Sequence, residues 1–183
     1  MSKVFFGGSR KMGRLSQAVR DRTDNIIANG YLILVGDANG ADKAMQRYLS
    51  EKSYRKVLVF CMDDVCRNNV GKWETRHVPS SRSKKDFHYY STKDTLMSDE
   101  ADYGFMLWDG KSKGTLNNIF NLYDRNKKIL VYFSPTRDFY LIRDKQDLSR
   151  LLDHCDSESL RKSGQALLIS RGIHLRQQLL NFS

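Results

Sequence analysis

The chain has 183 residues, of which 40% are hydrophobic and 28% are charged, and this composition is typical of one soluble globular domain. No apolar run is long enough to cross a bilayer, which excludes a helical membrane protein. The net charge of +10 favours anionic partners, from a nucleotide to a nucleic acid. Residues 1–7 have too short an apolar part for a signal peptide, so we expect a cytoplasmic protein with no membrane partner.

Hydrophobic periodicity predicts alternating strands and helices in the first third of the chain. Strands are expected at residues 3–6, 31–35 and 56–60, and helices at residues 14–29 and 41–53. Asn29-Gly30 ends the first helix, because a glycine is favoured just after the last helical residue. This β-α-β-α-β order predicts a parallel, doubly wound sheet.

The middle of the chain is less regular, and the alternation returns after residue 100. Strands are expected at 75–78, 103–108 and 128–133, with an added edge strand at 139–142. Helices are expected at 84–100, 115–125, 147–154 and 160–180. In the helix at 84–100, the residues expected to point inward are Phe87, Tyr90, Leu96 and Met97. The predicted fold class is therefore a Rossmann-like three-layer α/β domain with a mostly parallel sheet, plus C-terminal helices. Residues 1–135 form the expected nucleotide-binding domain, and residues 136–183 form an extension packed on the same domain. A homo-oligomer is left open.

The cysteines give no sign of a disulfide framework or a metal site. The chain has three cysteines, Cys61, Cys66 and Cys155, and four scattered histidines. A Cys-x4-Cys pair without neighbouring histidines lacks the ligand spacing of a zinc finger. We therefore expect buried thiols, no metal and no cofactor.

Three glycine-rich loops follow predicted strands. They are Gly7-Gly8-Ser9-Arg10, Gly36-Asp37-Ala38-Asn39-Gly40-Ala41-Asp42, and Asp109-Gly110-Lys111-Ser112-Lys113-Gly114-Thr115. Loops at the carboxyl ends of parallel strands share one edge of the sheet, and ligands bind at that edge. Glycine, hydroxyl and cationic residues in such loops predict a site for a phosphate-bearing molecule.

The first loop allows close approach to an anion. Gly7 and Gly8 let the backbone come near a ligand, Ser9 can donate its hydroxyl, and Arg10 can fork onto a phosphate. A simple tight turn explains the same residues equally well.

The second loop is more specific, because glycines at 36 and 40 permit a close turn before a helix. Asp37 would repel a phosphate but can accept from ribose or base groups. Asp42 falls in the first helical turn, where the helix dipole stabilises a carboxylate, so a helix-terminus role is the alternative. The spacing is neither that of a Walker A loop nor that of a Gly-x-Gly-x-x-Gly fingerprint.

The third loop is similar to a phosphate cradle. Ser112 and Thr115 are hydroxyl donors, although either can be a helix cap instead. Gly114 permits close approach, and Lys111 can neutralise charge. Asp109, at the strand tip, can bind a ribose hydroxyl or serve as base or nucleophile.

The order of the three loops, with Ala101-Asp102 before the third, resembles the SLOG superfamily and is most similar to its YspA-like branch. Relatives in this superfamily are the Lonely Guy phosphoribohydrolases, the DNA-processing protein DprA and, more distantly, the nucleoside deoxyribosyltransferases. The resemblance covers residues 3–133. It implies a Rossmann-like fold that binds nucleotides or nucleotide derivatives.

One departure from the pattern bears on catalysis. The phosphoribohydrolases have Pro-Gly-Gly-x-Gly-Thr-x-x-Glu, whose glutamate takes part in N-glycosidic cleavage. Gly114-Thr115 matches this pattern, but Asn118 stands at the glutamate position. An amide cannot act as a carboxylate base, so catalysis would need a carboxylate from another position. The candidates for that role are Asp37, Asp42 and Asp109.

We therefore predict a sensor or binding protein for a nucleotide or nucleotide sugar. An enzyme acting at an N-glycosidic bond and a DNA-binding protein related to DprA are the alternatives, the latter supported by the net charge and by basic residues at 76–93. The predicted ligand-binding residues are Gly7, Gly8, Ser9, Arg10, Gly36, Asp37, Asn39, Gly40, Asp42, Asp109, Lys111, Ser112, Gly114, Thr115 and Asn118.

Overall fold

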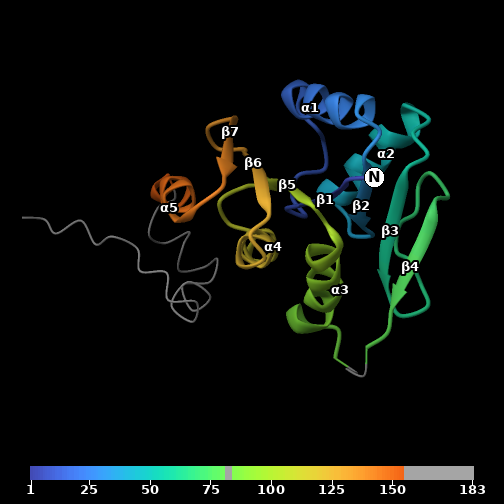
Figure 1. The fold of residues 1–183 in the computed structure, drawn as a ribbon. Helices are drawn as coiled ribbons and strands as arrows, with labels where there is room; N and C mark the ends of the chain where they lie inside the picture. The colour runs from blue at the N-terminus through green and yellow to red at the C-terminus, as the bar shows by residue number, and fades with distance from the viewer. Residues whose placement is uncertain (81–83, 155–183) are drawn as a thin grey trace, which may run out of the picture.

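The computed structural model of the chain describes residues 1–80 and 84–154, and Figure 1 shows the arrangement of its elements. The strands are β1 (Lys3–Gly8), β2 (Leu32–Gly36), β3 (Val57–Met62), β4 (Glu74–Val78), β5 (Tyr103–Trp108), β6 (Lys128–Phe133) and β7 (Asp138–Ile142). The helices are α1 (Gln17–Ala28), α2 (Ala41–Glu51), α3 (Phe87–Glu100), α4 (Lys113–Asp124) and α5 (Lys145–Asp153).

The strands form one sheet in the order β4-β3-β2-β1-β5-β6-β7. Every pair is parallel except β6 with β7, which is antiparallel. From β1 to β4 the sheet grows in one direction, and β5 then pairs with the other side of β1. This reversal of strand order leaves a crevice at the carboxyl ends of β1 and β5, where ligands bind in open α/β sheets.

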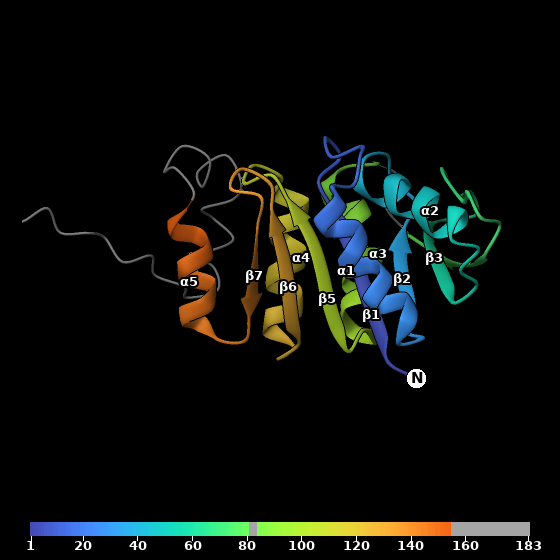
Figure 2. The same cartoon turned by 90° about the horizontal axis from the view of Figure 1, so that it is seen from above.

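Helices cover both faces of the sheet, as the two views in Figures 1 and 2 show. Val19 of α1 and Met45 of α2 belong to the core on one face, whereas Met97 of α3 belongs to the core on the other face, together with residues of α4 and α5. Phe5 and Phe6 of β1 point to opposite faces, and each is only 1% exposed. β1 is thus buried on both sides, as a central parallel strand must be.

This three-layer architecture confirms the predicted fold class. The edge strand expected at 139–142 is β7, and α5 packs beside it. The helix expected at 160–180 lies outside the described residues, so the division of the chain at residue 135 stays a prediction. Among the helices that the structure describes, none is both long and apolar enough to cross a membrane.

Polar caps determine where two helices begin. α1 begins later than its periodicity predicted, because Ser16 is its N-cap and the Ser16 hydroxyl accepts a hydrogen bond from the amide of Val19 at 3.4 Å. α3 likewise begins after Asp86, whose carboxylate accepts from the amide of Tyr89 at 3.0 Å. Such side chains satisfy amides that lack a partner within the helix.

The expectation of free thiols at Cys61 and Cys66 is wrong. The two cysteines form a disulfide, with their Cα atoms 5.0 Å apart. Cys61 lies near the end of β3, and the loop after this strand turns back so that Cys66 reaches it. The Cys-x4-Cys spacing does not reveal this turn, because it depends on where the strand ends. Cys155 lies outside the described residues.

Gly8→Ala should destabilise the protein. A Cβ at Gly8 would lie 2.7 Å from the Ala41 Cβ and 2.8 Å from the Leu107 carbonyl oxygen, so backbone must shift. We expect the free energy of unfolding to fall by about 1–3 kcal/mol, measured by urea denaturation. Gly13→Ala is the matched control, since no atom lies within 4 Å of its added Cβ. Equal stabilities for the two variants would contradict this account.

Candidate functional site

A cavity of about 510 Å³ lies at the carboxyl edge of the sheet, over β1 and β5. Its wall is formed by the loop after β1, the start of α2, the first turns of α3 and the loop between β5 and α4. The amide of Ser9 donates to the carbonyl of Leu107 at 3.0 Å, so the loop after β1 is bonded directly to β5. The strand reversal therefore brings together residues that are about a hundred positions apart in sequence.

Most of the predicted ligand-binding residues line this cavity. Those that do are Gly7, Gly8, Ser9, Arg10, Asp42, Asp109, Lys111, Ser112, Gly114, Thr115 and Asn118. The first and third loops meet there, since the hydroxyl oxygens of Ser9 and Thr115 are 3.5 Å apart. The structure thus brings the two loops into one concave surface, and their role in binding stays a prediction.

Four residues of the second loop do not line the cavity. Gly40 has a φ of +84°. A Cβ at this position would overlap the backbone of Arg10, so Gly40 packs directly against the first loop. Asn39 is exposed and accepts a hydrogen bond from Asn68 at 3.1 Å. Gly36 lies against buried side chains, and Asp37 faces the loop after β3. The second loop therefore shapes the site and contributes only Ala38 and Asp42 to its wall.

Polar side chains of the third loop form hydrogen bonds to backbone amides of the same loop. The carboxylate of Asp109 accepts from the amides of Lys111 at 3.0 Å and Ser112 at 2.8 Å. Ser112 is the N-cap of α4, and its hydroxyl accepts from the amide of Thr115 at 3.3 Å. The helix N-terminus is thereby directed at the cavity, and backbone amides at such an end favour an anion.

Asp42 and Lys93 are both buried next to Gly36. Lys93 is 4% exposed, and its ammonium group donates to Asp94 at 2.8 Å. Burial raises the pKa of Asp42 to about 7, although the charge of Lys93 opposes this. Burial also disfavours the charge of Lys93, but the carboxylates of Asp94 and Asp42 outweigh it and raise the pKa of Lys93. The ammonium group is the stable charge here, and Asp42 is the group that titrates.

The three carboxylates suggested for catalysis differ in what they can do. Asp37 does not line the main cavity and is ion-paired with Arg67. Burial raises the pKa of Asp37, but the hydrogen bonds from Arg67 outweigh burial and hold this pKa below its usual value. Asp109 is used in its own loop. Asp42 lines the cavity and can exchange a proton near neutral pH, so acid–base chemistry at this site would depend on Asp42.

Asn118 has an unsatisfied buried acceptor. The side chain is 6% exposed, and its Oδ1 atom has no hydrogen-bond partner among the described residues. Because a buried polar atom without a partner costs about 1–3 kcal/mol, this atom suits a donor that a ligand or a water molecule brings into the cavity. The position is the one where the sequence departs from the phosphoribohydrolase pattern.

Several wall residues were missed or misassigned from the sequence. Phe87 was expected to point into the core but is 40% exposed and lines the cavity, whereas Tyr90, also expected inward, packs partly buried against the core and lines the cavity as well. Arg67 comes from the irregular segment after β3, which carried no signal of a site. The guanidinium groups of Arg10 and Arg67 lie over the Tyr90 ring, 5.4 Å and 4.5 Å from its centroid. A tyrosine flanked by arginines gives this wall both a π surface and positive charge.

Metal binding has no support in the part of the chain that the structure describes. Residues 1–80 and 84–154 contain no group of three or more histidine, cysteine, aspartate or glutamate side chains placed to bind an ion.

Comparisons with known proteins support the fold. No protein-family model matches the chain, and no curated protein matches it in sequence. Among solved structures, the chain is similar to DNA processing protein A from Helicobacter pylori, a structure described for its single-stranded DNA binding mode, with 18% identity and a TM-score of 0.53. The match covers 71% of this chain and 64% of that chain, so this chain spans less than two thirds of its neighbour.

The likeness shows a shared Rossmann-like α/β fold. DNA processing protein A is one of the relatives that the SLOG resemblance names, so the sequence motifs and the structural comparison lead to the same fold.

Asp42 should make the free energy of unfolding depend on pH. Its pKa is 3.8 in a model peptide and about 7 in the folded protein. The folded state therefore binds this proton more tightly, and the stabilisation is full below about pH 4 and is lost as the pH rises through about 7. From about pH 5 to about pH 8 the free energy of unfolding of the wild type should fall by about 1–3 kcal/mol more than that of Asp42→Asn, measured by urea denaturation. Equal losses in both proteins would show that Asp42 is ionised throughout.

Proposed function

We propose that this protein binds single-stranded DNA, with nucleotide units of the strand seated in the cavity at the carboxyl ends of β1 and β5. The observation that carries the proposal is the combination of cationic and aromatic side chains around one cavity. Proteins that bind single strands combine a positive groove along the backbone with aromatic rings on which bases stack.

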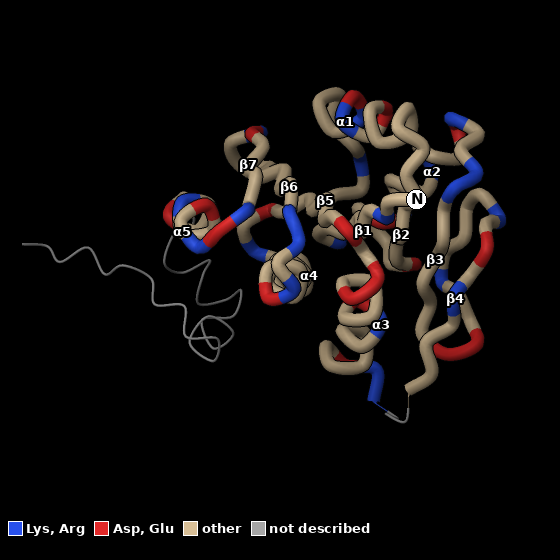
Figure 3. The backbone as a smooth tube through the Cα atoms, viewed as in Figure 1, with Lys and Arg blue, Asp and Glu red and all other residues tan. Residues whose placement is uncertain are grey.

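The cations come from separate segments of the chain. Arg10 and Lys11 follow β1, Lys85 precedes α3, and Lys111 follows β5; all four are exposed and line the cavity. Figure 3 shows the basic segment at the start of α3. Positive side chains on both sides of a cavity can contact successive phosphates of a strand.

The aromatic rings lie on the first turn of α3. Phe87 is the exposed ring, at 40%, whereas Tyr90 is half-buried and the guanidinium groups of Arg10 and Arg67 already lie over its ring. Exposed aromatic side chains next to cations are the surface that a base can stack on without sequence preference. The single-stranded DNA binding of the similar DNA processing protein A supports the same proposal.

A free nucleotide or nucleotide sugar is the second candidate, and Asn118 favours it. A cavity of about 510 Å³ lies within the usual size range of small-molecule sites. An unsatisfied acceptor in its wall suits a small ligand with a hydroxyl or amino donor. This candidate is also what the YspA-like resemblance implies.

Removing cavity cations should weaken DNA binding. For Arg10→Ala with Lys111→Ala, we expect affinity for a labelled oligothymidylate of about 15 nucleotides to fall tenfold or more, measured by fluorescence anisotropy, and each lost phosphate contact to lower the salt slope by about 0.7. Lys128→Ala is the control, because Lys128 is exposed at the opposite end of β6. If the wild type does not bind at low salt, or if all variants bind alike, the DNA proposal fails.

Asn118→Leu separates the second candidate from a structural role. The variant keeps the branching and the number of side-chain heavy atoms and removes the unsatisfied buried Oδ1 atom, so the free energy of unfolding should stay close to that of the wild type. Calorimetric titration with nucleoside monophosphates, ADP-ribose, NAD and cyclic nucleotides should identify a ligand of the wild type, and Asn118→Leu should weaken its binding by about tenfold. A folded wild type that binds none of these compounds would exclude this candidate.

A further inference from the structure

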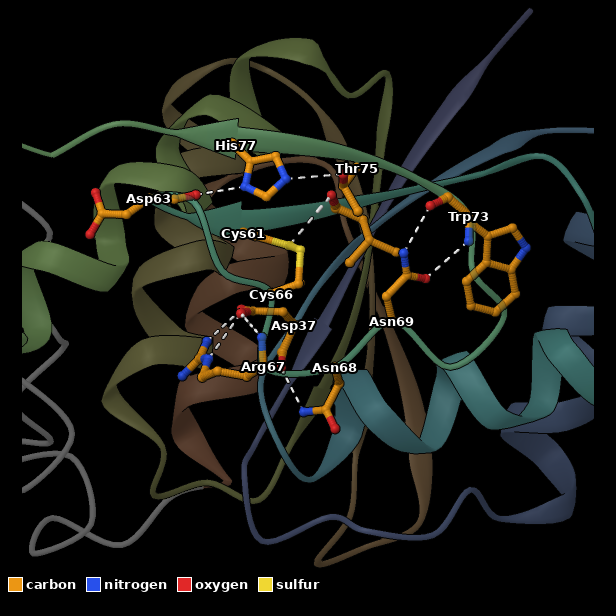
Figure 4. The surroundings of a disulfide bond; sticks show 12 residues. Asp37, Cys61, Asp63, Cys66, Arg67, Asn68, Asn69, Trp73, Thr75 and His77 are labelled. Atoms are coloured by element: carbon orange, nitrogen blue, oxygen red, sulfur yellow. Dashed lines mark hydrogen bonds and ion pairs between the residues drawn. A yellow bond between two sulfur atoms is a disulfide. The ribbon is translucent and has the colours of Figure 1, made fainter.

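The disulfide stands next to a residue of the cavity wall. Cys61 is fully buried at the end of β3, whereas Cys66 is half-buried in the following loop. Arg67 comes directly after Cys66 and lines the cavity. Figure 4 shows the sulfur–sulfur bond and the Arg67 side chain on the same short segment.

Arg67 forms the main contact between this segment and the second glycine-rich loop. Its amide and Nε each donate to Asp37 Oδ2 at 3.0 Å, and its Nη2 donates to Asp37 Oδ1 at 2.5 Å. Asp37 is 1% exposed, so its negative charge is buried and depends on this partner. On its other side Arg67 lies over the Tyr90 ring at 4.5 Å.

The loop has other anchors, and none of them involves Cys66. Asn68, directly after Arg67, donates to the carbonyl of Asp37 at 2.8 Å and to Asn39 at 3.1 Å. At its start, the amide of Asp63 donates to Val78 at 3.0 Å. At its end, Gln46 accepts from the amide of Val70 at 2.9 Å and donates to the carbonyl of Asn68 at 3.3 Å. Asp64 and Val65 between these anchors are exposed. The disulfide is therefore the anchor on the N-terminal side of Arg67, and Asn68 is the anchor on its C-terminal side.

We propose that Cys61–Cys66 is a thiol–disulfide exchange site, and that its reduction weakens the binding of an anionic ligand by releasing Arg67 from Asp37. The proposal rests on the proposed function, because it concerns the same cavity. Without the disulfide, Cys66 is free to move and the paired geometry of Arg67 is less populated. Asp37 then keeps a buried negative charge near the cavity while the cavity loses a cation, and both changes disfavour a phosphate.

The exchange needs a dithiol reductant. A thiolate of the reductant attacks Cys66 Sγ, which is the more accessible sulfur, and the Cys61–Cys66 bond breaks. Cys61 leaves as a thiolate and takes up a proton. The second thiol of the reductant then attacks its own sulfur in the mixed disulfide and releases Cys66 as a thiolate, which is also protonated. Two electrons pass to the protein, and the reductant becomes a disulfide.

The binding test compares oxidised and reduced protein in a Cys155→Ser background, so that Cys61 and Cys66 are the thiols that react. Affinity for the oligothymidylate is measured by anisotropy with and without dithiothreitol. We expect reduction to weaken binding about fivefold or more, and Cys66→Ser to bind like the reduced protein in either condition. Arg67→Ala should bind weakly and respond little to reduction. Equal affinities of the oxidised and reduced forms would overturn the proposal.

A second measurement keeps the inference separate from the proposed function. Hydrogen exchange at the Arg67 amide, which donates to Asp37, needs no ligand. Reduction should accelerate this exchange. Exchange at the Val70 amide, which donates a hydrogen bond to Gln46, should change little. If oxidised protein binds no oligothymidylate but Arg67 exchange is accelerated, the DNA proposal fails and the exchange site stands. Unchanged exchange at Arg67 overturns the inference whatever the ligand.

Discussion

The pairing of β5 with β1 is the constraint on which the site depends. Val4 to Gly8 of β1 lie in register with Tyr103 to Leu107 of β5, so two loops that are far apart in sequence end at the same height. The amide of Ser9 then bonds to Leu107, and its hydroxyl reaches Thr115. A parallel sheet with a reversal of strand order leaves this edge open, because helices cover the faces and not the ends.

Several buried charged side chains lie next to the cavity. Asp37 is paired with Arg67, and Lys93 is paired with Asp94 beside Asp42. Such groups are expensive to bury, and each one limits how its neighbours can move. The loop after β2 is therefore bonded to the loop after β3 through Asp37 and Arg67. The exposed side chains of the wall come from the start of α3 and from the loops after β1, β3 and β5.

The two candidate functions use different parts of the same cavity. A DNA strand would depend on the exposed cations and on the exposed ring of Phe87. A free nucleotide would depend on the deeper hydrogen-bonding groups, of which Asn118 is the unsatisfied one. Arg67 belongs to both, because it lies over Tyr90 and also neutralises a buried carboxylate. Because Arg67 directly follows the disulfide-bonded Cys66, the redox state of the cysteines would affect the binding of either ligand.

The sequence by itself determined the strands, the helices and the glycine-rich loops that follow β1, β2 and β5. These are local properties, because hydrophobic periodicity and glycine content act over a few residues. Only the tertiary structure decided which side chains face the cavity. Asp37 turns towards Arg67, Phe87 turns outward, and Cys66 reaches Cys61. Each of these depends on where an irregular loop folds back onto a strand from another part of the chain, and no local pattern encodes that contact.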